Sequence, residues 1–133
     1  KKVNIPIQNI NVFIIGITFK GEPPTNDYRE SSSLKTYRFL SKKVNSLYCY
    51  DHVLSESNYK VPEGINFKSL NYIHNADAIL ILNNHQGNVK GDFFNLLNKK
   101  KKLLIFDGWG QIQKGQIEKN NLWTYSTLGY MTK

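Results

Sequence analysis

Residues 12–33 read VFIIGITFKGEPPTNDYRESSS, and this stretch decides the fold of the chain. Its first six residues are mostly apolar and β-branched, which is typical of a strand buried on both faces of a parallel sheet. A loop with charged residues follows, and three serines then open a helix. Parallel sheets bind ligands at the carboxyl ends of their strands, so the sequence predicts a binding site in this loop.

Outward from this stretch, apolar strands alternate with segments of helical pattern. We expect strands at residues 10–17, 46–50, 78–82 and 103–106, and a last strand or extended tail at 122–129. We expect helices at residues 31–44, 69–75 and 93–98, and mostly loop at 53–67. This order predicts an α/β fold, namely a Rossmann-like doubly wound parallel sheet in a single three-layer domain.

Length and charge narrow the possible functions. A chain of 133 residues with a net charge of +8 is one domain with a basic surface, which favours phosphorylated ligands or other polyanions. The basic run at 99–102 sits between a helix and a strand, so we interpret it as a solvated loop and expect no nucleic-acid partner. The chain has no apolar run of about 20 residues and no signal-peptide pattern, so we expect no membrane partner and a cytoplasmic location.

The residues most often used for catalysis are sparse. Cys49 is the single cysteine and lies in an apolar segment, so we interpret it as a core residue. The three histidines are scattered, and the sequence has neither a Cys-x-x-Cys motif nor a helical pair of histidines. We therefore expect no metal site and no catalytic residue in this chain.

Three loops should converge at the carboxyl edge of the sheet, namely residues 19–30, 83–87 and 107–110. They contain a lysine for a phosphate, glycines for close approach of backbone, and Trp109 for stacking on a base or sugar. The alternative is that they are ordinary turns. No G-x-G-x-x-G follows the first strand, so the domain should not hold NAD in the usual manner.

Three motifs, at residues 16–40, 76–85 and 104–110, carry a resemblance to a known family. They read GITFKGEPPTNDYRESSSLKTYRFL, ADAILILNNH and LIFDGWG. In this order they resemble the C-terminal, UDP-binding domain of the UDP-glucose/GDP-mannose dehydrogenase family. The resemblance covers most of residues 11–110. It implies that residues 1–133 are the nucleotide-sugar-binding domain of a larger enzyme, and the start at Lys1 agrees with an excised fragment.

The resemblance also implies roles for individual residues. Phe19 and Lys20 match residues that line the nucleotide-sugar site. Arg29 matches an arginine that reaches toward the NAD diphosphate. Asp107 and Gly108 match the strand end beside the substrate, and Trp109 stands where many members have an arginine that contacts the substrate.

Members of this family oxidise a sugar C6 alcohol to a carboxylate with NAD, which an N-terminal domain of the same polypeptide binds. The resemblance therefore implies a UDP-sugar partner, a homo-oligomeric parent enzyme and a role in polysaccharide biosynthesis. Trp109, and the long loop that contains Pro23 and Pro24, suggest an N-acetylated hexosamine as the sugar. The alternative function is a free-standing Rossmann-like module that binds a phosphorylated ligand or nucleic acid.

Overall fold

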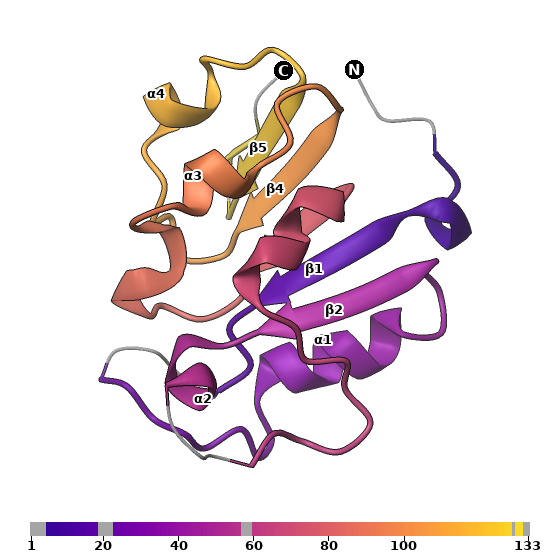
Figure 1. Cartoon of the computed structure of the whole chain (residues 1–133), viewed down its shortest axis with the longest axis vertical. Helices are drawn as coiled ribbons and strands as arrows, with labels where there is room; N and C mark the ends of the chain where they lie inside the picture. The colour runs from indigo at the N-terminus through magenta and orange to yellow at the C-terminus, as the bar shows by residue number, and fades with distance from the viewer. Residues whose placement is uncertain (1–4, 19–22, 57–59, 129, 132–133) are drawn as a thin grey trace.

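The computed structural model describes residues 5–18, 23–56, 60–128 and 130–131. Its centre is one six-stranded sheet in the order β2-β1-β3-β4-β5-β6 (Figure 1). The strands are β1 (Asn11–Ile15), β2 (Ser46–Tyr50), β3 (Ala78–Ile81), β4 (Leu103–Asp107), β5 (Trp123–Thr127) and β6 (Tyr130–Met131). The first five are parallel and β6 is antiparallel to β5. The predicted α/β fold with a doubly wound parallel sheet is confirmed.

The strand order creates a switch point beside β1. β1 pairs with β2 on one side, where Ile15 lies opposite Tyr50, and with β3 on the other, where it lies opposite Ile81. The chain therefore leaves β1 in one direction across the sheet and returns to continue in the other direction. Ligands of open parallel sheets bind at the carboxyl ends of the strands at such a point.

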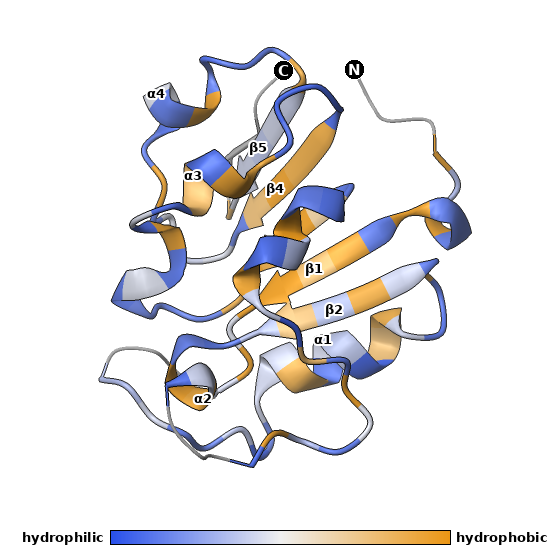
Figure 2. Ribbon diagram, viewed as in Figure 1, coloured by the Kyte–Doolittle hydropathy of each residue, from blue (hydrophilic) through white to orange (hydrophobic). Residues whose placement is uncertain are grey.

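Helices cover both faces of the sheet and give the three layers. The α-helices are α1 (Ser32–Leu40), α2 (His52–Ser55), α3 (Phe93–Leu96) and α4 (Lys114–Ile117). The 3-10 helices are η1 (Ile7–Asn9), η2 (Leu70–Asn75) and η3 (Gln86–Val89). The apolar residues of α1 pack against one face of β1, whereas those of η2, α3 and α4 pack against the other. Figure 2 shows β1 and β4 as largely hydrophobic ribbons between amphipathic helices.

The start of α1 agrees with the sequence, but its end does not. Ser31 caps the helix, because its hydroxyl accepts a hydrogen bond of 3.1 Å from the amide of Leu34. The prediction placed the end of the helix at residue 44, whereas α1 ends at Leu40. The amides of Lys43 and Val44 both turn back to the carbonyl of Leu40, and this turn delivers the chain to β2.

Three other local expectations need correction. The predicted helix at 69–75 is the 3-10 helix η2, Leu70–Asn75, which ends shortly before β3 begins. The expected loop at 53–67 begins inside α2, which Asp51 caps with two hydrogen bonds to backbone amides. The short helix α4 has no marked amphipathic pattern, and the sequence analysis missed it.

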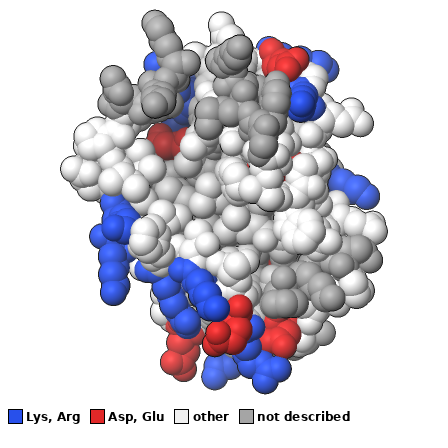
Figure 3. Space-filling view, turned by 180° about the vertical axis from the view of Figure 1, so that it is seen from behind, with Lys and Arg blue, Asp and Glu red and all other residues white. Residues whose placement is uncertain are grey.

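Charged side chains of both signs occur together on the face shown in Figure 3. Figure 3 shows Lys and Arg around the periphery of one face, interleaved with Asp and Glu at its lower end. In the basic run at 99–102, Lys101 pairs with Asp77 over 2.7 Å, while its three neighbours are exposed. Within the described residues, no helix is long and apolar enough to cross a membrane.

Candidate functional site

Asp51 ties the carboxyl ends of β1 and β2 together. It follows β2 directly and is only 1% exposed. Its Oδ2 accepts hydrogen bonds from the amides of Ile17 and Thr18, at 2.8 and 2.9 Å, and from the hydroxyl of Thr18 at 3.1 Å. Its Oδ1 accepts the two amides that begin α2. The carboxylate is thus occupied by groups of its own chain.

A second set of hydrogen bonds extends this connection to β3 and beyond. Asn83, which is 1% exposed, donates from Nδ2 to the hydroxyl of Thr18 at 3.1 Å and to Asp51 at 3.3 Å. Asn88 donates to the carbonyl and to Oδ1 of Asn83, at 2.8 and 3.0 Å, and also to Gln111 at 3.3 Å. These buried side chains therefore link the ends of β1, β2 and β3 with the loop after β4.

Gly16, directly after β1, allows Asn83, which follows β3, to approach the backbone closely. Its φ angle is +95°, a conformation that favours glycine. A Cβ at this position would lie 2.5 Å from Cγ of Asn83. The sequence lacks a dinucleotide-binding fingerprint around Gly16. In the structure, the side-chain amide of Asn83 lies beside this glycine.

Asp107 organises the loop that follows β4. It is 0% exposed, and its Oδ2 accepts hydrogen bonds from the amide of Ile112 at 2.8 Å and from the hydroxyl of Tyr125 at 3.0 Å. Its Oδ1 accepts the amide of Trp109 at 3.3 Å. Burial raises the pKa of Tyr125 to about 12, and the hydrogen bond to Asp107 adds to this shift. The carboxylate of Asp107 therefore holds the loop after β4 in place through hydrogen bonds to its backbone.

Trp109 lies at the carboxyl edge of the sheet and is 54% exposed. Its indole Nε1 donates to the carbonyl of Leu82, just after β3, over 3.3 Å. The hydroxyl of Ser33, in the first turn of α1, donates to the same carbonyl over 3.4 Å. The expectation that Trp109 is not a core residue is confirmed, and its contact with a ligand stays a prediction.

Gly108 connects the same two strands through its backbone. Its amide donates to the carbonyl of Ile81 over 3.0 Å, and a Cβ on this residue would lie 3.1 Å from that oxygen. The loops after β3 and β4 are therefore in contact, and Thr18 brings the loop after β1 to the same place. The predicted contact of the loops at 83–87 and 107–110 is confirmed, whereas the convergence of the loop at 19–30 with them stays a prediction, because the contact with Asn83 comes from Thr18, just before that loop.

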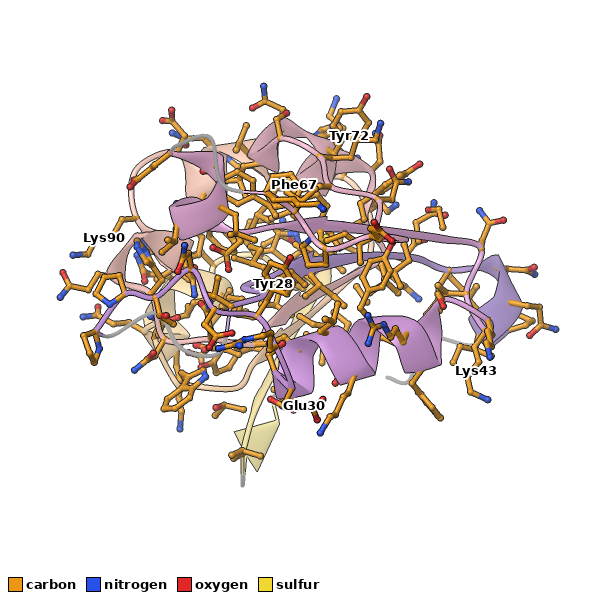
Figure 4. All side chains as sticks on the ribbon, turned by 90° about the horizontal axis from the view of Figure 1, so that it is seen from below. Tyr28, Glu30, Lys43, Phe67, Tyr72 and Lys90 are labelled. Atoms are coloured by element: carbon orange, nitrogen blue, oxygen red, sulfur yellow. The ribbon has the colours of Figure 1, made fainter. Side chains whose placement is uncertain are left out.

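Arg29 lies on the surface of the loop that leads into α1. Its guanidinium pairs with the carboxylate of Asp27 through two contacts, of 3.1 and 3.0 Å, and its side chain is 85% exposed. The hydrogen bonds from Arg29 lower the pKa of Asp27. Residues 26–29 line a hollow of about 380 Å³. Figure 4 shows Tyr28 pointing over the sheet ends, with Glu30 at the start of α1.

Two predicted site residues, Phe19 and Lys20, lie outside the described residues. A larger hollow of about 770 Å³ lies beside Lys99 and Trp123, at the amino ends of β4 and β5. We do not assign it to the site, because ligands of parallel sheets bind at the opposite edge.

Sequence reasoning missed a contact between His52 and His85. The two imidazole rings stack with centroids 5.0 Å apart and planes 8° apart. They are 33 positions apart in the sequence, so no local pattern could have paired them; their positions after β2 and β3 were the only signal. Among the described residues, no group of three or more His, Cys, Asp or Glu side chains could hold a metal ion.

Cys49 is a buried, free thiol, as the sequence predicted. Burial raises its pKa to about 12, with a smaller contribution from the charge of Asp51. A thiol with so high a pKa is not a nucleophile at neutral pH.

Comparison with protein families gives one match. The sequence model of the UDP binding domain of the UDP-glucose/GDP-mannose dehydrogenase family matches residues 13–114, which is most of the chain. The comparison with curated proteins gives no match.

Solved structures with a similar fold include two nucleotide-sugar dehydrogenases. A UDP-D-ManNAc dehydrogenase from Pyrococcus horikoshii aligns with a TM-score of 0.68 at 23% identity, over 95% of this chain and 27% of that chain. A UDP-N-acetyl-mannosamine dehydrogenase from S. aureus aligns with a TM-score of 0.60 at 20% identity, over 92% of this chain and 26% of that chain. This chain thus spans about a quarter of their length.

A third similar structure is an NAD-dependent formate dehydrogenase from Staphylococcus aureus in complex with NAD. It aligns with a TM-score of 0.60 at 16% identity, over 92% of this chain and 35% of that chain. At this identity the likeness concerns the fold alone.

Proposed function

Because this chain belongs to the UDP-glucose/GDP-mannose dehydrogenase family, we propose that it binds a UDP-sugar at the carboxyl edge of its sheet. The observation that carries the proposal is the match of residues 13–114 to the UDP binding domain of that family. The convergence of the loops after β1, β3 and β4 beside the switch point supports this location.

Individual residues take different parts in this proposal. Trp109, exposed at the edge, stacks on the base or on the apolar face of the sugar. Gly108 keeps the backbone open to the ligand, and Asp107 acts indirectly, because its buried carboxylate holds the amide of Trp109. Phe19 and Lys20 line the nucleotide-sugar site, the lysine neutralising the diphosphate.

The parent enzyme, in the same proposal, is an NAD-dependent dehydrogenase that oxidises the sugar C6 alcohol to a carboxylate. NAD is held mainly by an N-terminal domain, toward which the exposed Arg29 points its charge. The geometry after β2 supports this division. An acidic residue at this position commonly binds the ribose of NAD in dinucleotide-binding domains, but here the carboxylate of Asp51 is occupied by its own chain.

The sugar in this proposal is an N-acetylated hexosamine. Two similar solved structures are dehydrogenases of UDP-N-acetylmannosamine, which supports this choice. The parent enzyme is a cytoplasmic homo-oligomer that supplies polysaccharide biosynthesis.

Calorimetry of the 133-residue chain with UDP, UDP-glucose and UDP-N-acetylmannosamine tests the proposal. We expect weak binding, with a dissociation constant in the millimolar range, or about −4 kcal/mol, because one wall of the cleft belongs to another domain. We expect no NADH production by the chain alone. Lys20→Ala should weaken binding by about 1.5–3 kcal/mol, because a charge-assisted contact to the diphosphate is lost.

Lys42→Ala is the matched control, because Lys42 is exposed just beyond the last residue of α1, at the end of the helix remote from the site. It should leave the affinity unchanged. If both substitutions weaken binding equally, the loss in Lys20→Ala is due to net charge alone. If neither UDP nor either UDP-sugar binds, the proposed function is overturned.

A further inference from the structure

The stacked histidines connect two loops across the end of β1. His52 is the first residue of α2, directly after Asp51 at the end of β2. His85 precedes η3 in the loop after β3. Because β1 lies between β2 and β3 in the sheet, the pair of rings bridges the switch point at the proposed binding site.

His85 holds its loop through an unprotonated nitrogen. Its Nδ1 accepts a hydrogen bond of 2.9 Å from the amide of Gly87, and in this way the side chain caps η3. A proton on Nδ1 would remove that acceptor. Gly87 also lies beside both rings, since a Cβ on this residue would lie 3.1 Å from Nδ1 of His85 and 3.2 Å from Nδ1 of His52.

His52 is also poorly suited to carry a charge. Its Nε2 is buried and has no hydrogen-bond partner among the described residues. Burial lowers its pKa, and the neighbouring His85 lowers it further, whereas the carboxylates of Asp51 and Glu56 raise it. The fourth neighbour, Tyr50, contacts the ring edge-on with centroids 4.9 Å apart. Burial, together with His85, therefore outweighs the two carboxylates and favours the neutral form of His52.

We propose that His52 and His85 form a proton-sensitive clasp, which holds residues 83–90 in place when both rings are neutral and releases them when either ring is protonated. The clasp matters for ligand binding because the same segment contains Asn83 and Asn88, whose hydrogen bonds join the ends of β1 and β3 to the loop of Trp109. The inference that release weakens UDP-sugar binding rests on the proposed function.

The closed segment requires neutral imidazole rings, so a fall in pH should open it. The contribution of His52 to the closed segment is complete above the ordinary histidine pKa of about 6.5 and is lost as the pH falls through the lowered pKa of the folded state. For each proton that opening takes up, the ratio of closed to open segment should fall by up to about tenfold per pH unit, and UDP affinity should fall with it once the open form predominates.

NMR on the 133-residue chain tests the clasp directly. Between pH 7.5 and 5, the amide of Gly87 should progressively lose its protection from hydrogen exchange as the pH falls. His85→Asn combined with His52→Phe keeps an acceptor for the amide of Gly87 and a ring beside Tyr50 but has no imidazole in the clasp, so this double variant should keep both the protection and the UDP affinity in acid. His74→Asn is the control, because His74 is exposed on η2, and it should behave like the unsubstituted chain.

Unchanged protection of Gly87 at pH 5 in the unsubstituted chain would overturn the clasp, as would an identical pH dependence in the double variant. If the double variant does not fold, His52→Phe alone serves instead, because it keeps a ring beside Tyr50, and its pH dependence should then be weaker than that of the unsubstituted chain. If no variant binds UDP at pH 7.5 while the amide of Gly87 still responds to pH, the clasp stands and the proposed function fails.

Discussion

The side chain of Asn83 lies against the backbone of Gly16, so closely that a Cβ on Gly16 would stand 2.5 Å from its Cγ. Gly16 directly follows β1, and Asn83 lies shortly after β3, the neighbouring strand. The absence of one side chain therefore lets the hydrogen bonds of Asn83 reach Thr18 and Asp51.

Gly16→Ala should lower the free energy of unfolding by about 2–5 kcal/mol, since it combines backbone strain with overpacking against Asn83. Gly64→Ala is the matched control, because Gly64 has a similar φ of +76° with open space around it. The control should cost only about 1–2 kcal/mol. Urea denaturation measures both variants, and equal costs would contradict the importance of the Gly16–Asn83 contact.

Asp51→Asn should be strongly destabilising. The substitution places an NH₂ group opposite backbone amides, either those of Ile17 and Thr18 or those of α2, and leaves buried donors unsatisfied. We expect a loss of at least about 2 kcal/mol in urea denaturation. The control is Asp92→Asn, because Asp92 is exposed and makes no capping hydrogen bond at the start of α3. A comparable loss in the control would refute the specific role of Asp51.

Trp109 should report ligand binding by its fluorescence. The indole is half exposed beside the site, so a stacked base or sugar changes its surroundings. Trp123→Phe removes the second indole, which is 8% exposed and lies at the start of β5, away from this edge. Saturating UDP-N-acetylmannosamine should then shift or quench the remaining signal, and an unaltered spectrum would place Trp109 outside the contact surface.

Arg29→Ala should affect the chain and its parent enzyme differently. In the isolated chain the exposed pair with Asp27 contributes little, so stability and UDP-sugar affinity should hardly change. In the full-length enzyme the substitution should raise the KM for NAD, because a charge-assisted phosphate contact is lost. Weaker UDP-sugar binding with an unchanged KM for NAD would assign Arg29 to the substrate instead.

Cys49 should be unreactive toward thiol reagents in the folded chain at pH 8 and should react fully in urea. Because its folded pKa is raised to about 12, its neutral form contributes stability that is complete below the unfolded value of about 8.5 and is lost at higher pH. Between pH 8.5 and 10 the free energy of unfolding should therefore fall by up to about 1.4 kcal/mol per pH unit. Cys49→Ala should reduce this slope, and an equal slope would show that other groups cause it.

The sequence alone determined the class of fold and the family. Buried parallel strands read as continuous apolar runs such as residues 12–15, and their alternation with helical segments leaves few topologies open. The same patterns placed Trp109 in a loop just after the end of a strand, where the structure shows it exposed. These features are local, since a few neighbouring residues suffice to specify a buried strand or a helix cap.

Only the tertiary structure decided how the site is held together. Three contacts join residues more than 30 positions apart, and no periodicity encodes such pairs: those of Asp51 with Ile17 and Thr18, that of Asn83 with Gly16 and the stacking of His52 on His85. Their geometry depends on the strand order and register, which bring the ends of β1, β2 and β3 side by side. Asp107 shows the same limit, because its position at a strand end was readable, but its burial by Tyr125 and Ile112 required the folded chain.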